Sequence, residues 1–170
     1  MWKLETERFL MRKLKPDDAT PKYLSWLANQ KTSKYIRYKQ NNLVNLKNYI
    51  CETISNSNVN FLAVIDKRTG EHIGNIKFIF LNPEYSVIEM GILIGESSYH
   101  GRGVAGELIN EFARFAVRNY NSKLMLLGVD KSNLTAIKAY RKIGFKEEKK
   151  LYEIDRNIGL LMSWSLPELE

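Results

Sequence analysis

The chain has 170 residues, which is enough for one domain with its own hydrophobic core. Hydrophobic residues make up 44% and aromatic residues 11%, values typical of globular proteins, so the composition excludes a wholly disordered chain. The net charge of +7 at pH 7 favours anionic partners, and nucleic acid, a membrane surface and a phosphorylated small molecule all fit that charge.

The single cysteine and the N-terminal segment bear on the compartment. Cys51 has no partner for an internal disulfide, which suits a reducing compartment. Its apolar neighbours Tyr49, Ile50 and Ile54 predict a buried structural thiol on a helix. Residues 1–16 are charged throughout, and no stretch reaches the roughly 18 apolar residues of a membrane span. We therefore expect a cytoplasmic protein that does not act at a membrane.

The first third of the chain predicts one strand and two helices. Residues 8–14 mix β-formers with basic residues and are expected to form a strand. Residues 16–18, Pro-Asp-Asp, are typical of a helix start, and the helix is expected to continue to about residue 29. Apolar residues at helical spacing predict a second helix over 43–55.

The rest of the chain predicts one hairpin and then alternating strands and helices. A 3.6-residue apolar period marks the longest of these helices. In chain order the expected elements are strands 60–66, 72–80 and 86–94, helix 103–119, strand 124–129, helix 133–143, and strands near 145–153 and 158–165. Without a repeat, a low-complexity tract or a linker, this order predicts a single mixed α/β domain over residues 1–170.

The stretch GESSYHGRGVAGELINEF places four glycines before or at the start of the expected helix 103–119. The first turn of a helix has unpaired N–H groups with partial positive charge, so a diphosphate can bind there. Gly101, Gly103 and Gly106 would leave room for it, and Arg102 would add a full charge. An ordinary strand-to-helix turn explains the same glycines. The segment matches neither the P-loop nor the G-x-G-x-x-G pattern, which disfavours both classes.

A second cluster lies around the expected helix 133–143. Ser132 is available as its N-cap, and Gly144 is expected to end it. Asn133 and Tyr140 lie about two helical turns apart, so both face the same way and can serve a ligand lying along the helix. Packing of Tyr140 into the core, with its hydroxyl at the rim, is the alternative.

The two clusters together resemble one family. The stretch IEMGILIGESSYHGRGVAGELI, followed by LGVDKSNLTAIKAYRKIGF, resembles the GNAT superfamily of acetyl-CoA-dependent N-acetyltransferases. The opening TERFLMRKLKPDDA and the later YLSWLANQ…KYI look like its RimJ/RimL-type branch. The resemblance covers nearly the whole chain and implies a GNAT-type α/β (α+β) domain, with a central mixed, mostly antiparallel sheet flanked by about four helices. It implies acetyl-CoA as co-substrate and no metal.

The resemblance also implies a role for each matching residue. The family loop is typically Arg/Gln-x-x-Gly-x-Gly/Ala, often with tryptophan first in this branch, and His100 departs from it at that position. Residues 100–106 would hold the pyrophosphate of CoA, and strand backbone would pair with the pantetheine arm. Asn133 would contact the arm or an ordered water, and Tyr140 would face the thioester sulfur. The implied cofactor-binding set is Ile92, Ile94, His100, Gly101, Arg102, Gly103, Val104, Ala105, Gly106, Asn133 and Tyr140.

Acetyl transfer to an amine needs a base, an electrophilic partner for the carbonyl and a proton for the departing thiolate. Tyr140 is the candidate acid, because a thiol pKa near 8.5 and a tyrosine pKa near 10 allow a hydrogen bond or a proton to reach the sulfur. A backbone N–H of the strand before the glycine loop would polarise the carbonyl.

Glu89 in that strand is the candidate base, through a water relay, since burial can raise a carboxyl pKa. A surface position or a lysine partner is the alternative for it. Some relatives carry a Glu before the Asn–Tyr helix, where residues 127–129 hold no acid. His72 and His100 are further candidates for proton transfer.

The acceptor side is expected around residues 31–42, the 80–88 turn and the 150–157 turn. The segment KTSKYIRYKQ interleaves aromatic rings with cations, which suits a nucleotide base and its phosphates. An exposed basic helix end is the alternative. The candidate substrate-binding residues are Tyr35, Arg37 and Tyr38.

Several acceptors stay open at this point. The leading one is the amino group of a nucleotide-linked amino sugar, since HIGNIKF…IEMGILIG also looks like acetyltransferases of surface-glycan pathways. A protein N-terminal α-amine and an aminoglycoside are alternatives, and the chain's excess of Lys and Arg disfavours the polycationic aminoglycoside. A non-catalytic CoA-binding module is a further alternative. Scattered Lys and Arg disfavour a nucleic-acid binder. A homodimer is an open expectation because many relatives are dimers.

Overall fold

The computed structural model describes residues 3–36, 39–149 and 159–167, and the chain folds as two compact units. Unit 1 comprises Met1–Lys77 and Ile92–Val104, and unit 2 comprises Phe78–Gly91 and Ala105–Glu170. The strands are β1 Lys3–Glu5, β2 Phe9–Lys13, β3 Val59–Asp66, β4 His72–Phe80, β5 Val87–Ile94, β6 Leu124–Val129, β7 Lys146–Glu147 and β8 Leu160–Ser165. The helices are α1 Pro21–Ala28, α2 Gln30–Ser33, α3 Leu43–Ser55, α4 Val104–Tyr120 and α5 Leu134–Ile143, with 3₁₀ turns η1 Pro16–Asp18 and η2 Ser97–Tyr99.

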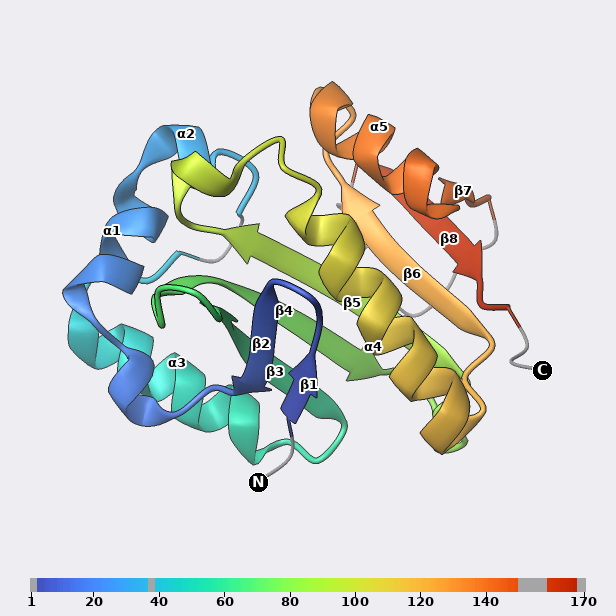
Figure 1. The fold of residues 1–170 in the computed structure, drawn as a ribbon, viewed down its shortest axis with the longest axis horizontal. Coiled ribbons are helices and arrows are strands. Elements are labelled where there is room, and N and C mark those ends of the chain that lie inside the picture. The colour runs from blue at the N-terminus through green and yellow to red at the C-terminus, as the bar shows by residue number, and fades with distance from the viewer. Residues whose placement is uncertain (1–2, 37–38, 150–158, 168–170) are drawn as a thin grey trace. The chain divides into compact units, whose positions relative to one another are not determined.

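The strands form an eight-stranded sheet in the order β1-β2-β3-β4-β5-β6-β8-β7 (Figure 1). Strands β5 and β6 are parallel, and α4 is the crossover helix that such a pair needs. The pairs β1–β2, β2–β3, β6–β8 and β7–β8 are antiparallel. Four of the described helices have eight residues or more. The predicted mixed, mostly antiparallel sheet with about four helices is therefore confirmed, while the single domain over residues 1–170 stays a prediction.

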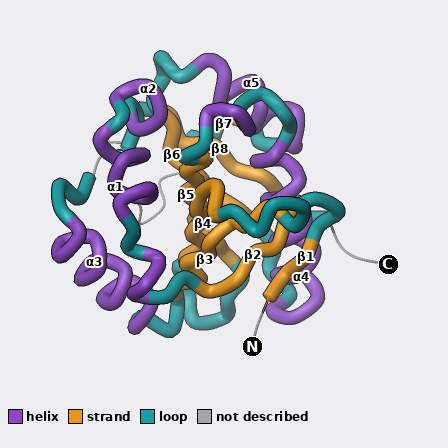
Figure 2. Tube along the Cα trace, turned by 60° about the vertical axis from the view of Figure 1, so that its left-hand side comes forward, coloured by secondary structure: helices purple, strands orange, loops and turns teal. Residues whose placement is uncertain are grey.

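In unit 1, helices α1 and α3 lie together beside the strands (Figure 2). Helix α3 buries Leu46 and Ile50, which lie one turn apart and contact the same cluster as Trp26 of α1. The hairpin between β3 and β4 closes because Asp66 Oδ1 accepts the backbone N–H groups of the next turn, at 2.7 and 3.0 Å. Gly70 follows with a φ of 73°, in the left-handed region that glycine adopts without strain. These contacts stabilise the turn that leads from β3 into β4.

In unit 2, the longest helix, α4, buries one apolar stripe. Phe112 of that stripe stacks on Phe78 of β4, with ring centroids 3.4 Å apart. Helix α5 ends at Gly144, whose φ of 127° and short distance to the Trp164 ring leave no room for a side chain. The predicted stop at Gly144 is thus confirmed.

Three details of the predicted fold are wrong. Residues 16–18 form only the 3₁₀ turn, and α1 begins at Pro21, because the Thr20 hydroxyl accepts the Tyr23 N–H at 3.2 Å and so supplies the N-cap. Cys51 is exposed, because it lies one position beyond buried Ile50 and points away from the core. The short elements β1 and α2 were not expected.

The C-terminal strands are shorter than expected where they are described. Strand β7 covers Lys146–Glu147 of the expected 145–153, and β8 covers Leu160–Ser165 of the expected 158–165. The remainder of both expected strands within 150–158 lies outside the described residues.

Candidate acetyl-CoA site

The glycine loop of unit 1 has the backbone conformation of an anion-binding turn. Gly101 and Gly103 have φ values of 72° and 74°, and Arg102 between them does not have a positive φ. Such alternation turns successive N–H groups toward one side of the chain. A Cβ placed on either glycine meets no described atom within 4 Å, so the space beside the loop is open. The loop therefore fits a diphosphate.

Contacts within unit 1 hold this loop in place. The Tyr99 hydroxyl donates to Asp66 Oδ2 at 2.6 Å, and this hydrogen bond raises the pKa of Tyr99 and lowers that of Asp66. Arg8 Nη2 donates to the carbonyl of Arg102 at 3.0 Å, and Phe9 of β2 meets the Tyr99 ring edge-on. No local pattern in the sequence marks these anchors, because the partners lie 33 and 94 residues apart.

At the end of β5, in unit 1, the backbone N–H and C=O groups of two residues point away from β4. The Gly95 N–H donates to the Ile73 carbonyl of β4 at 2.9 Å. Because N–H and C=O groups alternate in direction along a strand, those of Leu93 also face β4, and those of Ile92 and Ile94 face the opposite edge. This is the edge that the expected pairing with a pantetheine arm requires.

His100 takes up part of that edge. Its Nε2 lies 2.8 Å from the Ile94 carbonyl, so the imidazole holds the loop against the strand that precedes it. The family pattern has Arg, Gln or Trp at this position, and His100 here acts on the backbone. Its role in proton transfer stays a prediction.

Helix α4 begins at Val104, one position after the start expected from the sequence. Its first-turn N–H groups have no partner four residues earlier within the helix. Gly106 differs from the two loop glycines. A Cβ placed on it would lie 3.7 Å from the nearest side-chain atom of Ile143 of α5, an ordinary van der Waals distance, so the contact between the two helices of unit 2 does not itself require glycine.

The second cluster of unit 2 corrects one expectation. Asn133, not Ser132, is the N-cap of α5, and its Oδ1 accepts the Ala136 N–H at 3.2 Å. Ser132 instead donates both its N–H and its hydroxyl to Asp130 Oδ1, each at 2.7 Å. Asp130, the first acid after β6, therefore stabilises the turn. Asn133 keeps its amide N–H groups for a ligand, since no hydrogen bond from them is found among the described residues.

Tyr140 combines the two alternatives considered for it. Its ring meets Phe145 edge-on, with centroids 5.8 Å apart, and burial raises its pKa to about 12. Within the described residues its hydroxyl has no hydrogen-bond partner. The half-buried ring thus packs against the core residue Phe145 in unit 2, and the neutral hydroxyl remains able to donate.

Glu89 lies on β5 beside open space. It is half-buried, and its Cα partner on β6 is Leu126. Gly91 is on the same face of the strand, and a Cβ placed there meets no described atom within 4 Å. In the stretch where some relatives carry a Glu, Leu127 and Val129 are buried apolar residues.

His72 belongs to the interior of unit 1. Its Nε2 lies 3.0 Å from the Gly74 carbonyl and 2.9 Å from Asn75 Oδ1, and burial lowers its pKa. The rings of Tyr23 and Trp26 cover it edge-on. His72 is therefore held neutral by its surroundings.

The expected acceptor residues are only partly described. Tyr35 is exposed, and the Lys34 ammonium lies 5.0 Å from its ring centroid. Arg37, Tyr38 and the 150–157 turn lie outside the described residues. In the 80–88 turn, Tyr85 contacts Phe80 and Tyr120, so its ring has a packing role in unit 2.

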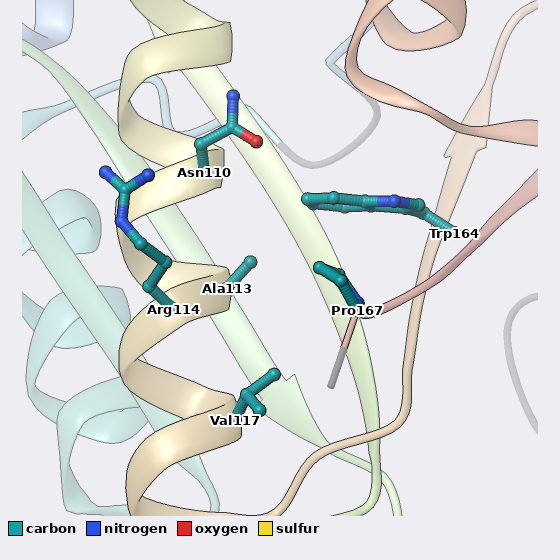
Figure 3. A pocket seen from close by; sticks show the side chains of 6 residues that line it. All are labelled: Asn110, Ala113, Arg114, Val117, Trp164 and Pro167. Carbon is teal, nitrogen blue, oxygen red and sulfur yellow. The ribbon is translucent and has the colours of Figure 1, made fainter. Parts of the chain in front are cut away.

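An apolar hollow of about 230 Å³ lies elsewhere in unit 2, between α4 and the end of β8 (Figure 3). Trp164 and Pro167 face Ala113 and Val117 across it. Arg114 at its rim already pairs with Glu111 at 2.7 Å. The hollow thus lacks the free cation that a phosphate would need.

The described residues contain neither a metal-ligand cluster nor a membrane-spanning helix. Among residues 3–36, 39–149 and 159–167 there is no cluster of three His, Cys, Asp or Glu side chains suited to a metal ion. In the same part of the chain, no helix has the length and apolar character needed to cross a bilayer.

Comparison with known proteins decides the family. Residues 8–146 match the family model described as "Acetyltransferase (GNAT) domain". The chain belongs to the GNAT acetyltransferases. It is accordingly an acetyl-CoA-dependent N-acetyltransferase, as the paired motifs predicted. No curated protein matches the chain.

Solved GNAT structures share the fold at low sequence identity. An acetyltransferase of the GNAT family from Bacillus anthracis is 16% identical, with a TM-score of 0.79, covering 96% of this chain and 98% of its own. Spermidine N-acetyltransferase from Vibrio cholerae, in complex with CoA and spermine, is 21% identical, with a TM-score of 0.76 and coverages of 94% and 96%. A V. cholerae protein named as a ribosomal-protein-serine acetyltransferase is 15% identical, with a TM-score of 0.77 and coverages of 96% and 97%. At these identities the likeness concerns the fold.

Proposed function

We propose that this GNAT enzyme acetylates the primary amine of a nucleotide-linked amino sugar. The observation that carries the proposal is the exposed ring of Tyr35 with the Lys34 ammonium 5.0 Å from its centroid. A solvent-exposed aromatic ring beside a cation suits a nucleotide base and its phosphates. The chain's net charge of +7 favours the same class of anionic substrate. A reducing compartment, the cytoplasm, is where we expect the reaction.

Acetyl-CoA binding is assigned to the loop and to the strand before it. The N–H groups of residues 100–106 bind the pyrophosphate, supported by the left-handed conformations of Gly101 and Gly103. The outward backbone groups of Ile92 and Ile94 pair with the pantetheine arm. Because His100 already bonds to the Ile94 carbonyl, the arm relies on the remaining groups of this edge or displaces the imidazole. Asn133 contributes its amide N–H groups.

Tyr140 acts as a hydrogen-bond donor to the departing sulfur. Its pKa of about 12 keeps the phenol neutral at pH 7. Full proton transfer to a thiolate of pKa about 8.5 would be uphill by about 3.5 pH units, or about 5 kcal/mol. A hydrogen bond stabilises the developing negative charge without that cost.

Glu89 removes the proton from the incoming ammonium through a water molecule. The amine nitrogen then attacks the thioester carbonyl carbon, a C–N bond forms and the C–S bond breaks. The nitrogen loses its second proton to water during this step, and the thiolate, stabilised by the Tyr140 hydrogen bond, takes up one proton from water, so the products are the amide and the CoA thiol. The open space over neighbouring Gly91 gives the relay water room beside the carboxylate.

A RimJ/RimL-like enzyme that acetylates protein N-termini is the second candidate. It is favoured by the opening TERFLMRKLKPDDA and by the fold likeness to the V. cholerae protein named for ribosomal-protein acetylation. Both candidates use the same acetyl-CoA chemistry and differ only in the acceptor.

A panel of acceptors tests the proposal. The enzyme is incubated with acetyl-CoA and a UDP-linked 4-amino sugar, an N-terminal peptide, spermidine or an aminoglycoside, and thiol release is followed. We expect the highest kcat/KM with the nucleotide sugar. Turnover confined to peptides would establish the second candidate. CoA binding without thiol release from any amine would indicate a non-catalytic binding module.

A further inference from the structure

An amide without a hydrogen-bond acceptor and a cation without a salt bridge share one face of β4 in the described part of unit 1. Asn75 and Lys77 are two positions apart, so their side chains lie on the same side of the strand, about 6.6 Å apart along it. Asn75 is only 3% exposed, and its Nδ2 is the buried polar side-chain atom of the described residues that has no hydrogen-bond partner.

The amide of Asn75 can be oriented without ambiguity. His72 Nε2 lies 3.0 Å from the Gly74 carbonyl, which can only accept, so Nε2 carries the proton. Asn75 must then present its oxygen to the same N–H, at 2.9 Å. Its two amide N–H bonds are left over, and an unsatisfied buried donor is costly enough that folded proteins seldom keep one without a use.

Lys77 is a half-buried cation held against two aromatic rings. Its Nζ lies 5.8 Å from the Tyr49 centroid and 5.9 Å from the Phe61 centroid, and it donates to the Tyr49 hydroxyl at 3.2 Å. No carboxylate of the described residues forms a salt bridge with it.

Two carboxylates of unit 1, those of Asp18 and Glu96, interact with residues other than Lys77. Asp18 pairs with Arg12 at 2.7 Å. Glu96 accepts from Trp26 Nε1 at 2.9 Å and lies 3.4 Å from Lys22. Among the described residues, the charge of Lys77 is therefore not neutralised by a salt bridge and is available to a bound partner.

This pair of donors adjoins the strand proposed to hold the pantetheine arm. The Gly95 N–H bonds to the Ile73 carbonyl, and antiparallel pairing then sets Asn75 opposite Leu93, within unit 1. Adjacent strands lie about 4.8 Å apart. Asn75 is thus one strand away from the backbone of Ile92 and Ile94.

We propose that Asn75 and Lys77 bind an oxyanion of the acceptor, a phosphate or carboxylate oxygen carried by the same molecule as the reacting amine. Lys77 supplies the charge, Asn75 supplies neutral N–H donors, and the rings of Tyr49 and Phe61 keep water away from the ammonium. Polycations such as spermidine are rejected, because their ammonium groups would be placed beside Lys77. This inference rests on the proposed function for the presence of an amine acceptor, and it adds the charge that the acceptor must carry.

Matched acceptors and variants test the proposal through turnover. The acceptors are a UDP-linked 4-amino sugar, a dipeptide, the same dipeptide amidated at its C-terminus, and spermidine. We expect Lys77→Gln to lower kcat/KM for the oxyanion-bearing acceptors by about 10- to 100-fold, mainly through KM, with KM for acetyl-CoA unchanged. Lys77→Arg should restore most of the loss. Lys47→Gln removes the same charge from the exposed face of α3 and should stay within about twofold.

The same comparison separates the two sources of an oxyanion. A loss confined to the nucleotide sugar assigns the site to phosphate, and a loss confined to the free dipeptide assigns it to carboxylate. Spermidine used as well as the oxyanion-bearing acceptors by the native enzyme would overturn the proposal, as would an unchanged KM in Lys77→Gln. Lys77→Met keeps the aliphatic stem on the rings and replaces Lys77→Gln if that variant has a lowered Tm.

A binding measurement keeps this inference separate from the proposed function. UDP-N-acetylglucosamine and an N-acetylated dipeptide carry oxyanions and no free amine, so neither can be acetylated. We expect calorimetry on the CoA-bound protein to show binding of at least one of them, weakened about 10-fold or more in Lys77→Gln. If no amine supports thiol release and this binding persists, the proposed function fails and the oxyanion site stands. If neither ligand binds, or Lys77→Gln binds equally well, the oxyanion site is refuted.

Discussion

Replacing Tyr140 by Phe removes one hydroxyl and leaves the ring in place. The edge-on contact with Phe145 is kept, so the fold of unit 2 should be unaffected. Hydrogen bonds to charged groups contribute about 1.5–3 kcal/mol, which corresponds to about 10- to 150-fold in rate when the charge develops only in the transition state. We therefore expect kcat to fall by that factor while the CoA dissociation constant changes by less than about twofold.

The pH profile distinguishes a hydrogen bond from proton transfer. Since the pKa of Tyr140 is about 12, its ionisation should contribute no alkaline limb to kcat below about pH 11. The assay is thiol release under saturating acetyl-CoA from pH 6 to 10, with Tyr120→Phe as the control for loss of an exposed phenol in the same unit. An unchanged kcat in Tyr140→Phe, or a loss of CoA affinity as large as the loss of kcat, would refute this role.

The remaining predictions concern glycine conformations and one histidine. Gly144→Ala should lower the free energy of unfolding by about 2 kcal/mol or more, because φ is 127° and the Cβ would lie 2.8 Å from Trp164 Nε1; urea unfolding measures this, and Gly91→Ala, which meets no described atom within 4 Å, should be neutral. Gly103→Ala should weaken CoA binding by about 5- to 30-fold in calorimetry, because a φ of 74° is strained for alanine and the exposed loop relieves that strain by leaving the anion-binding conformation, which leaves Tm little changed; equal affinity would contradict the loop assignment. His72 has a pKa lowered by burial, so the unfolded state binds its proton more readily, and stability is lost as pH falls below about 6.5. The native protein should therefore lose more stability than His72→Gln between pH 7.5 and 5.5, and equal losses would show that burial does not shift this group.

The elements that the sequence located well are those with strong local signals. Helix 43–55 and strands 72–80 and 124–129 match α3, β4 and β6 at both ends. Each is bounded by a cap, a turn residue or a change in apolar period, which act over a few residues. Local chemistry misled the prediction of a helix start where two prolines competed, at Pro16 and Pro21.

Side-chain direction was less predictable than element position. Cys51 was expected inside because its neighbours are apolar, and one residue of helical rotation, about 100°, places it on the surface. Ser132 and Asn133 are both good caps, and Asp130 decides between them by engaging the serine first. Such choices depend on which hydrogen bonds can form together, which propensity alone does not contain.

The residues of the candidate site also differ in whether local sequence signals could predict them. Gly101, Gly103, Asn133 and Tyr140 could be predicted from the sequence because the backbone and helix geometry they serve leaves a local pattern, and their roles stay predictions. Lys77 was not predicted, because its proposed role depends on contacts with the rings of Tyr49 and Phe61, which lie far from it in the sequence.

The glycines of the motif meet different structural requirements. Gly101 and Gly103 are needed for their left-handed backbone, while a Cβ on Gly106 would make an ordinary contact with Ile143, 3.7 Å away. Gly95 is needed for contact, since a Cβ there would lie 2.0 Å from the Trp26 ring. Trp26 in turn donates to Glu96, and Tyr99 donates to Asp66, so the loop is held on both sides by groups outside it. A loop whose N–H groups are fixed in advance would lose little entropy on binding the proposed diphosphate, and preorganisation of this kind would explain the use of glycine at positions 95, 101 and 103.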